Sequence, residues 1–526
     1  MGSREDPNHR LTLAASQGMI CTVDHLASSA GLSMLRGGGS AADAAVAAGA
    51  VLAVTAQHMC GLGGDLFALV HDGAGPPVAL NASGRSGSGA DALQLRLEGH
   101  RSMPFRRDIR SVPVPGCVDG WSALHERFGR LPLRDVLEPA IVYAHAGFPA
   151  SPLLAGLVPL LDGVTHAEEL VRPVPLRSGE VLTRPSVGAL LEELATEGRS
   201  GFYEGRFAER LIEVGAGEYD AEDLRQPHAD WVEPIGLDVW GSRVWTVPPN
   251  SQGYLILASA WMAERLPLPD DPRDPLWAHL LIEASKQAGC DRNEVLHEHA
   301  VATELLDPAR LEPRLEAIGS SGPSPLPVPS GHGDTAYLCV VDADRMAVSL
   351  IQSNAADFGA HLVLPEVKVF LHNRGIGFNL VPGHPAEYGP RRRPPHTLSP
   401  ALVTDPAGAL RAVLGTMGGD AQPQIVLQLL TRLLRHGQTT GEAVTAPRFS
   451  LVPGGFDTWK RPRGITAAVE DHARGCWSQG LRSRGHDVGI HPAGSGFGHA
   501  HCIAVTPAGL AGAADPRAQI GSTAGY

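Results

Sequence analysis

The 526-residue sequence has no apolar segment long enough to span a membrane and no recognisable secretory signal. Its longest apolar run, residues 41–56, is rich in alanine and contains Asp43. It falls short of the roughly 20 apolar residues that a membrane-spanning helix needs. Residues 1–23 lack a basic segment followed by a continuous apolar stretch. We therefore expect a soluble cytoplasmic protein with no membrane partner.

Positive charge is also scarce. The chain has 43 Lys and Arg against 56 Asp and Glu, which gives a formal net charge of −13. Nucleic acids and anionic membranes are bound by dense positive surfaces, so neither is expected as a partner. The main local exception is the run of three arginines at 391–393. It lies beside Pro394 and Pro395, and we interpret it as a solvated loop.

Paired cysteine spacing is missing as well. An odd number of dispersed cysteines in a chain of this length is typical of reduced thiols rather than a disulfide framework. The seven cysteines are Cys21, Cys60, Cys117, Cys290, Cys339, Cys476 and Cys502.

What is present is the composition of an ordinary globular protein, with 43% apolar residues. The first 330 residues are predicted to be mainly helical and the remainder mainly strands. Ser40 is predicted to cap a helix that runs to about residue 55. Residues 319–333 are rich in Gly, Pro and Ser and have the composition of a linker. Residues 335–354 follow it and are predicted to form a β-hairpin.

The common catalytic motifs are absent. The sequence contains no G-x-S-x-G elbow and no G-x-x-x-x-G-K-[ST] loop. Its clustered histidines, at 297–299 and 499–502, do not have the spacing of a metal site. No metal and no cofactor are therefore expected.

A threonine after the linker offers another chemistry. A hydroxyl is a poor nucleophile unless a base lies beside it, and a chain-terminal α-amine is a suitable base. Cleavage of the peptide bond between Asp334 and Thr335 would make Thr335 an N-terminal residue with such an amine. The pliable segment before Thr335 and the predicted strand after it supply the context for that cut, and Gly333 tolerates strained backbone geometry.

The hairpin gives a geometric expectation. With a three-residue turn at 343–345, Thr335 faces Ser353 across the ladder, whereas a four-residue turn places Asn354 opposite. Acyl transfer also needs convergent N–H groups that stabilise an oxyanion. Gly418 and Gly419, at a predicted strand-to-helix junction, are our candidates for them, with an ordinary tight turn as the alternative.

Several segments together resemble the γ-glutamyltranspeptidase family of N-terminal-nucleophile hydrolases, over nearly the whole chain and in the family's order. They are GGGSAADAAVAAGAV (37–51), GLGGD (61–65), PGCVDGW (115–121), PPNSQG (248–253), GDTAYLCVVDADRMAVS (333–349), MGGDAQPQ (417–424), APRF (446–449) and ADPRAQIGSTAGY (514–526).

This resemblance implies an α+β fold with four αββα layers, made as a proenzyme that cuts itself between Asp334 and Thr335. It implies a large subunit, residues 1–334, and a small subunit, residues 335–526, that remain associated. Whether two processed units form a homodimer is left open. Thr335 is then the nucleophile that cleaves an amide, and its acyl-enzyme is resolved by water or an amine.

The resemblance also implies roles for other residues. Ser353 matches the threonine that hydrogen-bonds the nucleophile, and Gly418 and Gly419 match the glycines of the oxyanion hole. Arg85 matches the arginine that binds the carboxylate of a small-molecule substrate. Arg374 and Asp420 are further candidates for the charge of the substrate pocket, with a structural ion pair as the alternative.

Three departures from the family pattern argue against glutamyl recognition. Gly377 stands where members specific for glutamyl groups carry an acidic residue for the substrate's α-ammonium. His396 and Thr397 replace a serine pair that helps to hold the carboxylate, and Ala355 replaces an asparagine. A buried ammonium without a counter-charge is costly. The chain is more similar in these segments to the branch that contains oxamate amidohydrolases and related acylases.

We therefore expect an amidohydrolase or acyltransferase with a non-standard acyl group, generally like γ-glutamyltransferase. One alternative is a biosynthetic enzyme of the same fold that cleaves another acyl group or a C–C bond. The other is a catalytically inactive relative that acts by binding.

Overall fold

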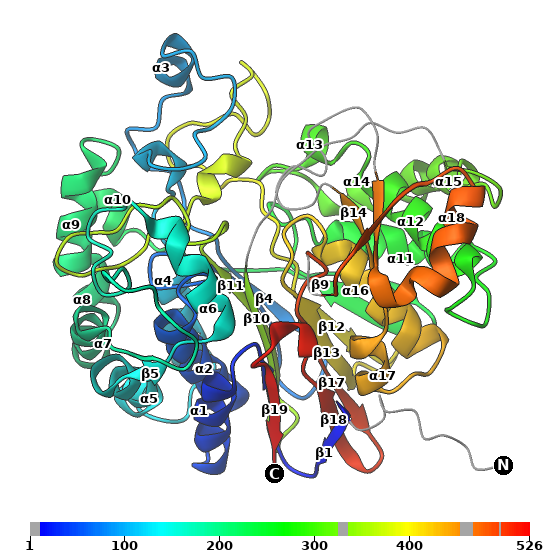
Figure 1. Cartoon of the computed structure of the whole chain (residues 1–526), viewed down its shortest axis with the longest axis horizontal. Helices are drawn as coiled ribbons and strands as arrows, with labels where there is room; N and C mark the ends of the chain where they lie inside the picture. The colour runs from blue at the N-terminus through cyan, green and yellow to red at the C-terminus, as the bar shows by residue number, and fades with distance from the viewer. Residues whose placement is uncertain (1–10, 324–334, 453–465, 494–495) are drawn as a thin grey trace.

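The computed structural model describes residues 11–323, 335–452, 466–493 and 496–526. Two seven-stranded sheets lie face to face at its centre, and helices cover the outer surface of each (Figure 1). Neighbouring strands are antiparallel throughout both sheets. The predicted α+β class with four αββα layers is therefore confirmed.

The strands of the two sheets come from all parts of the chain. The first sheet contains, in spatial order, β19 (Ser522–Gly525), β2 (Met19–Thr22), β10 (Ala336–Val341), β11 (Ala347–Ser353), β3 (Asp65–His71), β4 (Val78–Ala82) and β7 (Asp230–Val232). The second contains β1 (Leu13–Ala15), β18 (Gly509–Ala513), β17 (Ala500–Thr506), β13 (Leu410–Thr416), β12 (Ala401–Thr404), β9 (Ser242–Thr246) and β8 (Ile235–Val239). Seven of these fourteen strands precede residue 330, so the predicted contrast between a helical and a strand-rich part is only partly right. Strands as short as three residues leave no periodic pattern to detect.

The helices divide between the two outer layers. Those against the first sheet include α1 (His25–Arg36), α2 (Ala41–Thr55), α4 (Cys117–Phe128), α5 (Leu133–Ala146), α7 (Pro185–Glu197), α8 (Arg199–Tyr203) and α9 (Arg206–Gly215). Those against the second include α11 (Tyr254–Arg265), α12 (Pro275–Gly289), α16 (Gln422–Leu430), α17 (Thr440–Thr445) and α18 (Gln479–Ser483).

The remaining elements are short. The helices are α3 (Ala92–Leu97), α6 (Pro152–Leu157), α10 (Ala221–Arg225), α13 (Arg292–Val295), α14 (Ala302–Leu305) and α15 (Pro308–Glu316). The strands are β5 (Phe148–Pro149), β6 (Val181–Leu182), β14 (Phe449–Val452), β15 (Thr466–Glu470) and β16 (Asp487–His491).

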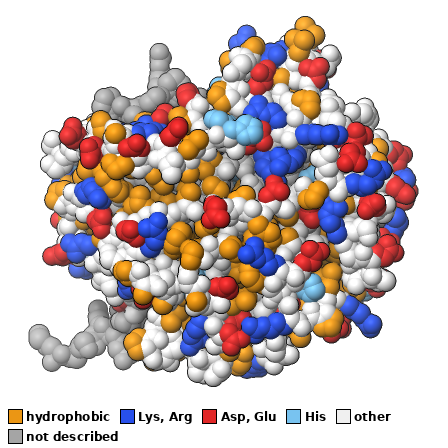
Figure 2. Space-filling model, turned by 180° about the vertical axis from the view of Figure 1, so that it is seen from behind, with side chains coloured by type: hydrophobic (Ala, Val, Ile, Leu, Met, Phe, Trp, Pro, Cys, Tyr) orange, Lys and Arg blue, Asp and Glu red, His pale blue; other side chains and the backbone are white. Residues whose placement is uncertain are grey.

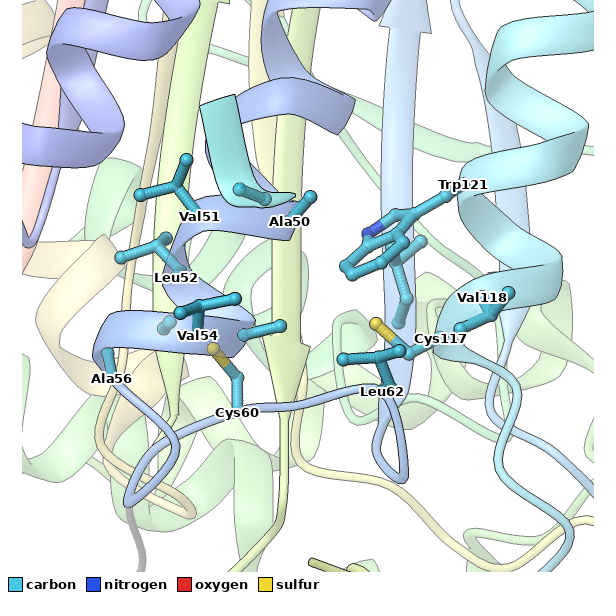
Figure 3. Close-up of a cluster of buried hydrophobic side chains, with 14 of the residues drawn as sticks. Ala50, Val51, Leu52, Val54, Ala56, Cys60, Leu62, Cys117, Val118 and Trp121 are labelled. Carbon is cyan, nitrogen blue, oxygen red and sulfur yellow. The ribbon is translucent and has the colours of Figure 1, made fainter. Parts of the chain in front are cut away.

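The alanine-rich segment forms α2, which is buried along its whole length. Ser40 caps it as predicted: its Oγ accepts the Asp43 N–H, and the Asp43 carboxylate accepts the Ser40 N–H, which completes a capping box. Small side chains let α2 approach β10 and β11 closely, and Figure 3 shows Ala50 on the side of α2 toward Trp121 of α4, with Val51 and Leu52 pointing away from it. At Gly49, a β-carbon would lie 2.7 Å from Gln352 Oε1, so a larger residue there would displace the Gln352 side chain.

The β10–β11 hairpin has the three-residue turn. Val341 pairs with Ala347, and the Asp342 N–H donates to the Met346 carbonyl at 2.9 Å. The Asp342 carboxylate accepts the N–H groups of Met346 and of Ala41, at 3.0 Å each. The turn is thereby fixed to the first residue of α2, and the alternative register with Asn354 opposite Thr335 is excluded.

Alternation along β10 and β11 gives each face of the first sheet its own core. Tyr337, Cys339 and Ile351 point into the space between the two sheets. Leu338 and Leu350 belong to the cluster under the helices. Thr335 and Ser353 have the same parity as the first group, so they lie at one end of the space between the sheets.

The surface opposite to the view of Figure 1 carries interspersed acidic and basic side chains (Figure 2). Among the described residues, no helix is both long and apolar enough to cross a membrane. All seven cysteines lie in the described part of the chain, and none of them forms a disulfide.

Candidate active site

Thr335 lies immediately before β10 and is 1% exposed. Its Oγ1 is 3.0 Å from Ser353 Oγ, the neighbour that the hairpin register predicts. Ser353 Oγ also accepts the Ala355 N–H at 2.8 Å. With that acceptor role filled, the Ser353 proton can be donated to Thr335 Oγ1. Asp334 lies outside the described residues, so the predicted cleavage junction is not described.

The Gly418–Gly419 turn follows β13 at the same end of the sandwich. The Tyr337 ring packs on Gly415, where a β-carbon would lie 2.5 Å from it, and this contact aligns the end of β13 with the start of β10. Gly418 has φ +133° and Gly419 has φ +56°. Neither N–H of the pair donates a hydrogen bond to any residue in the described ranges. Such groups are the kind that an oxyanion hole requires.

A polar cluster centred on Asp65 lies beside Ser353, because Asp65 pairs with Ser353 in the β3–β11 ladder. The Arg374 Nε–H donates to Asp65 Oδ2 at 2.7 Å. His396 Nε2 and His372 Nδ1 lie 3.0 Å and 3.1 Å from the same oxygen. Because His396 Nδ1 accepts the Leu398 N–H, its Nε2 carries the proton that is donated to Asp65.

Charge sets the protonation of this cluster. Burial alone would raise the pKa of Asp65, but the Arg374 guanidinium and the two histidine hydrogen bonds hold it well below its usual range. Burial, followed by the charge of Arg374, lowers the pKa of His396 to about 3. His396 is therefore neutral and Asp65 ionised near pH 7.

The structure brings Arg374 and Thr397 together, since Arg374 Nη1 donates to Thr397 Oγ1 at 3.0 Å. Asp420 directly follows the Gly418–Gly419 turn, and its Oδ1 is 3.5 Å from Arg292 Nη2. Arg374 and Asp420 thus form ion pairs with different partners.

Sequence reasoning missed Asp65 and His372 as members of the cluster. Asp65 is the last residue of the GLGGD segment (61–65), and this segment was the feature of the sequence that could have indicated it. His372 had none, because it meets Asp65 only through the fold.

Of the positions that depart from the glutamyl-specific pattern, His396 and Thr397 belong to the polar cluster around Asp65 and Arg374, whereas Ala355 lies in apolar surroundings. Ala355, Ala356 and Ile376 make a small buried cluster. At Gly377, a β-carbon would lie 2.3 Å from the Pro395 carbonyl oxygen. Position 377 therefore has no room for an acidic side chain in this backbone arrangement.

Arg85 is 30% exposed at its side chain and forms an ion pair with Asp230 at 3.0 Å. Its other ion-pair neighbour among the described residues is Glu298, at 3.9 Å, and the predicted binding of a substrate carboxylate by Arg85 stays a prediction.

The 391–393 arginine run is not simply a solvated loop. Arg393 is 5% exposed, and its Nη2 donates to Asp230 at 2.6 Å. Burial and the nearby charge of Arg85 lower the pKa of Arg393 to about 10. The prediction holds for Arg391, which is exposed, and is wrong for Arg393, whose segment is held in the fold where Asn250 Nδ2 donates to the Pro394 carbonyl at 2.7 Å.

One group in the described residues has donors that could hold a metal ion, namely His279, Glu283 and His486. His279 Nδ1 and His486 Nε2 are 2.7 Å apart and share a hydrogen bond, and Lys286 donates to Glu283 at 2.8 Å. His279 and Glu283 lie on α12, and His486 directly precedes β16.

Comparisons with known proteins agree with this geometry. The gamma-glutamyltranspeptidase family model matches residues 27–525. The chain belongs to this family. It is 35% identical to the oxamate amidohydrolase proenzyme of Klebsiella pneumoniae, over 97% of this chain and 99% of that protein. It is also 35% identical to the glutathione hydrolase-like YwrD proenzyme of Bacillus subtilis, over 95% and 97% of the two chains.

Among solved structures, cephalosporin acylase from Bacillus halodurans superposes with a TM-score of 0.88 at 30% identity, over 100% of this chain and 99% of that one. The protein is thus an enzyme of the N-terminal-nucleophile hydrolase type, a hydrolase or acyltransferase of the gamma-glutamyltranspeptidase family. Its relatives are named as proenzymes, which supports processing into subunits.

Proposed function

We propose that the protein cuts itself between Asp334 and Thr335 and then uses Thr335 to hydrolyse or transfer an acyl group that bears a carboxylate but no α-ammonium. The observation that carries the proposal is the buried Thr335 hydroxyl, which lies 3.0 Å from Ser353 Oγ at the residue immediately before β10. The large subunit is then residues 1–334 and the small subunit residues 335–526.

The chemistry follows from the groups around Thr335. The Thr335 oxygen attacks the amide carbonyl carbon while its proton passes to the α-amine that cleavage creates. Ser353 holds the hydroxyl in place, and the N–H groups of Gly418 and Gly419 stabilise the oxyanion. The C–N bond breaks and the amine leaves with the proton. Water, or a second amine, then attacks the ester and gives its proton to the α-amine, and the Thr335 hydroxyl is restored when the acyl group departs.

The acyl specificity rests on the apolar cluster and on the backbone at Gly377. An α-ammonium placed against Ala355 and Ile376 would lose water and gain no counter-charge, which costs several kcal/mol. Oxamate, the compound in the name of the Klebsiella relative, is an amide with a carboxylate and no amino group. We assign this substrate class to the present chain, with Arg85 and Thr397 as the groups that bind the carboxylate.

The test compares dicarboxylic monoamides, which have no α-ammonium, with a γ-glutamyl amide that carries one. The purified protein is incubated with oxamate, succinamate and glutaramate, and with a γ-glutamyl anilide, and the release of ammonia or aniline is measured. We expect kcat/KM for at least one dicarboxylic monoamide to exceed that for the anilide by roughly 100-fold, the factor equivalent to about 2.7 kcal/mol. A preference for the anilide would refute the specificity, and activity that survives Thr335→Ala would refute the nucleophile.

A further inference from the structure

Gln252 links the Gly418–Gly419 turn to the segment that carries Thr397. It is completely buried in the loop between β9 and α11, within the PPNSQG motif. Its Nε2 donates to the Gly419 carbonyl and to the Thr397 carbonyl, at 3.0 Å each. Both amide protons of this side chain are therefore used on the two sides of the candidate site.

The backbone of Gln252 is held at both ends. Its N–H donates to the His396 carbonyl at 2.9 Å, and its own carbonyl accepts the Leu255 N–H at 3.0 Å. The first bond belongs to a parallel bridge between Ser251 and His396, and the second begins α11. The side chain thus extends from a fixed base.

The turn that Gln252 contacts needs such an external support. Two adjacent glycines have the widest conformational freedom of any dipeptide, so their N–H groups are not aimed by local sterics. The Gly418 carbonyl accepts the Ala421 N–H at 3.0 Å, which sets the plane of the Gly418–Gly419 peptide and so the direction of the Gly419 N–H. The next peptide is set by the Gly419 carbonyl, which accepts Gln422 N–H at 3.2 Å and Gln252 Nε2 at 3.0 Å.

We propose that Gln252 is a positioning residue that aims the Gly418–Gly419 turn at the oxyanion, and that it ties this turn to the Thr397 segment. The inference rests on the proposed function of that turn. Gln252 should therefore affect kcat. Without it the N–H donors of the turn would be misplaced, and a displacement of about 1 Å can lower a rate by roughly 100-fold.

A purely structural role fits the geometry less well. Gln252 Oε1 is buried and receives no hydrogen bond from any residue that the structure describes. An orphaned acceptor lowers stability, so a side chain selected only for packing would not carry one. The amide is explained by its two donated bonds, one of which ends on Gly419.

The experiment replaces Gln252 in the full chain and uses the neighbouring Ser251 as the matched control. Gln252→Leu removes both donors, and Gln252→Glu keeps the shape but places carboxylate oxygens against two carbonyls. Ser251→Ala removes a buried bond of the same loop, from Ser251 Oγ to the Leu398 carbonyl at 2.6 Å, without touching Gly419. For each variant we measure kcat, KM, the self-cleavage half-time and the thermal midpoint.

We expect kcat to fall about 10- to 100-fold in Gln252→Leu and further in Gln252→Glu, with KM within about twofold and kcat of Ser251→Ala near wild type. A Gln252 variant that folds but stays uncleaved is judged by its self-cleavage half-time, which should lengthen at least about tenfold relative to Ser251→Ala.

A change confined to KM would assign Gln252 to Thr397 instead and overturn the proposal. So would an unchanged kcat, or an equal loss in Ser251→Ala at an equal drop in thermal midpoint. Failure of the proposed function is distinct, because wild-type protein would then show no Thr335-dependent turnover at all.

Discussion

The polar groups on the two sides of Thr335 differ in whether their hydrogen bonds are already made. On the side of β3, the Asp65 carboxylate is saturated by Arg374, His372 and His396. On the side of β13, the N–H groups of Gly418 and Gly419 donate to no residue in the described ranges. The first arrangement stabilises charge that is already present in the folded enzyme. The second is suited to charge that develops only during the reaction.

The largest expected effect comes from removing the charge of Asp65 from its cluster with Arg374, His372 and His396. Asp65→Asn removes the counter-charge of the buried Arg374 and should lower the free energy of unfolding by about 3–5 kcal/mol, as for other buried pairs that lose one partner. Urea denaturation, monitored by tryptophan fluorescence, measures the change. A loss below about 1 kcal/mol would show that the cluster does not behave as a buried ion pair.

On the other side, Gly418→Ala should affect activity more than stability. A φ of +133° is rarely adopted by residues with a β-carbon, so the turn must shift and carry its N–H groups away. We expect kcat to fall about 10²- to 10³-fold, the effect of losing one oxyanion donor. Gly437→Ala, at another positive φ with open space around it, is the matched control for strain alone. An equal loss of kcat in both variants would contradict the assignment.

Acid should lower the contribution of the Asp65 cluster to the free energy of unfolding, within a defined pH window. The pKa of His396 falls from 6.5 to about 3 on folding, so below pH 6.5 the unfolded chain binds a proton that the folded chain does not. Its contribution to stability is present above pH 6.5 and is lost as the pH falls toward 3, by up to about 1.4 kcal/mol per pH unit.

His396→Gln keeps a donor for Asp65 without the titration. The slope of unfolding free energy against pH, measured between pH 7 and 5, should therefore become shallower by about that amount. An unchanged slope would mean that His396 does not titrate as this cluster requires.

The smallest effect on stability is expected from substituting Arg85. Its side chain is partly exposed, whereas that of Arg374 is buried. Its ion pair with Asp230 is partly exposed, so Arg85→Met should cost no more than about 1 kcal/mol. If Arg85 binds the substrate carboxylate, KM should rise while kcat changes little. An unchanged KM would remove Arg85 from the binding site and leave it as a surface ion pair.

The sequence was sufficient where the chemistry depends on local pairing. Thr335 and Ser353 are eighteen residues apart, and the length of one turn decides that they face each other. The cap at Ser40 is likewise local. The Asp65 cluster could not be predicted, because His372, Arg374 and His396 reach Asp65 only when the loops after β11 fold back on β3.

The same reasoning explains the other differences. The absence of an acidic residue at Gly377 was visible in the sequence, but the lack of space there depends on the Pro395 carbonyl. The burial of Arg393 depends on Asp230 and on Asn81, whose Oδ1 accepts from Arg393 Nη1 at 3.2 Å. Contacts between distant segments decide both.

The central claim is that Thr335 becomes a chain terminus and acts as the nucleophile. The most direct measurement is the denatured mass of the purified protein, with Thr335→Ala alongside. We predict two fragments for the wild type, one of which begins at Thr335, and a single intact chain for the variant. An intact wild-type chain, or cleavage that persists in the variant, would contradict the account.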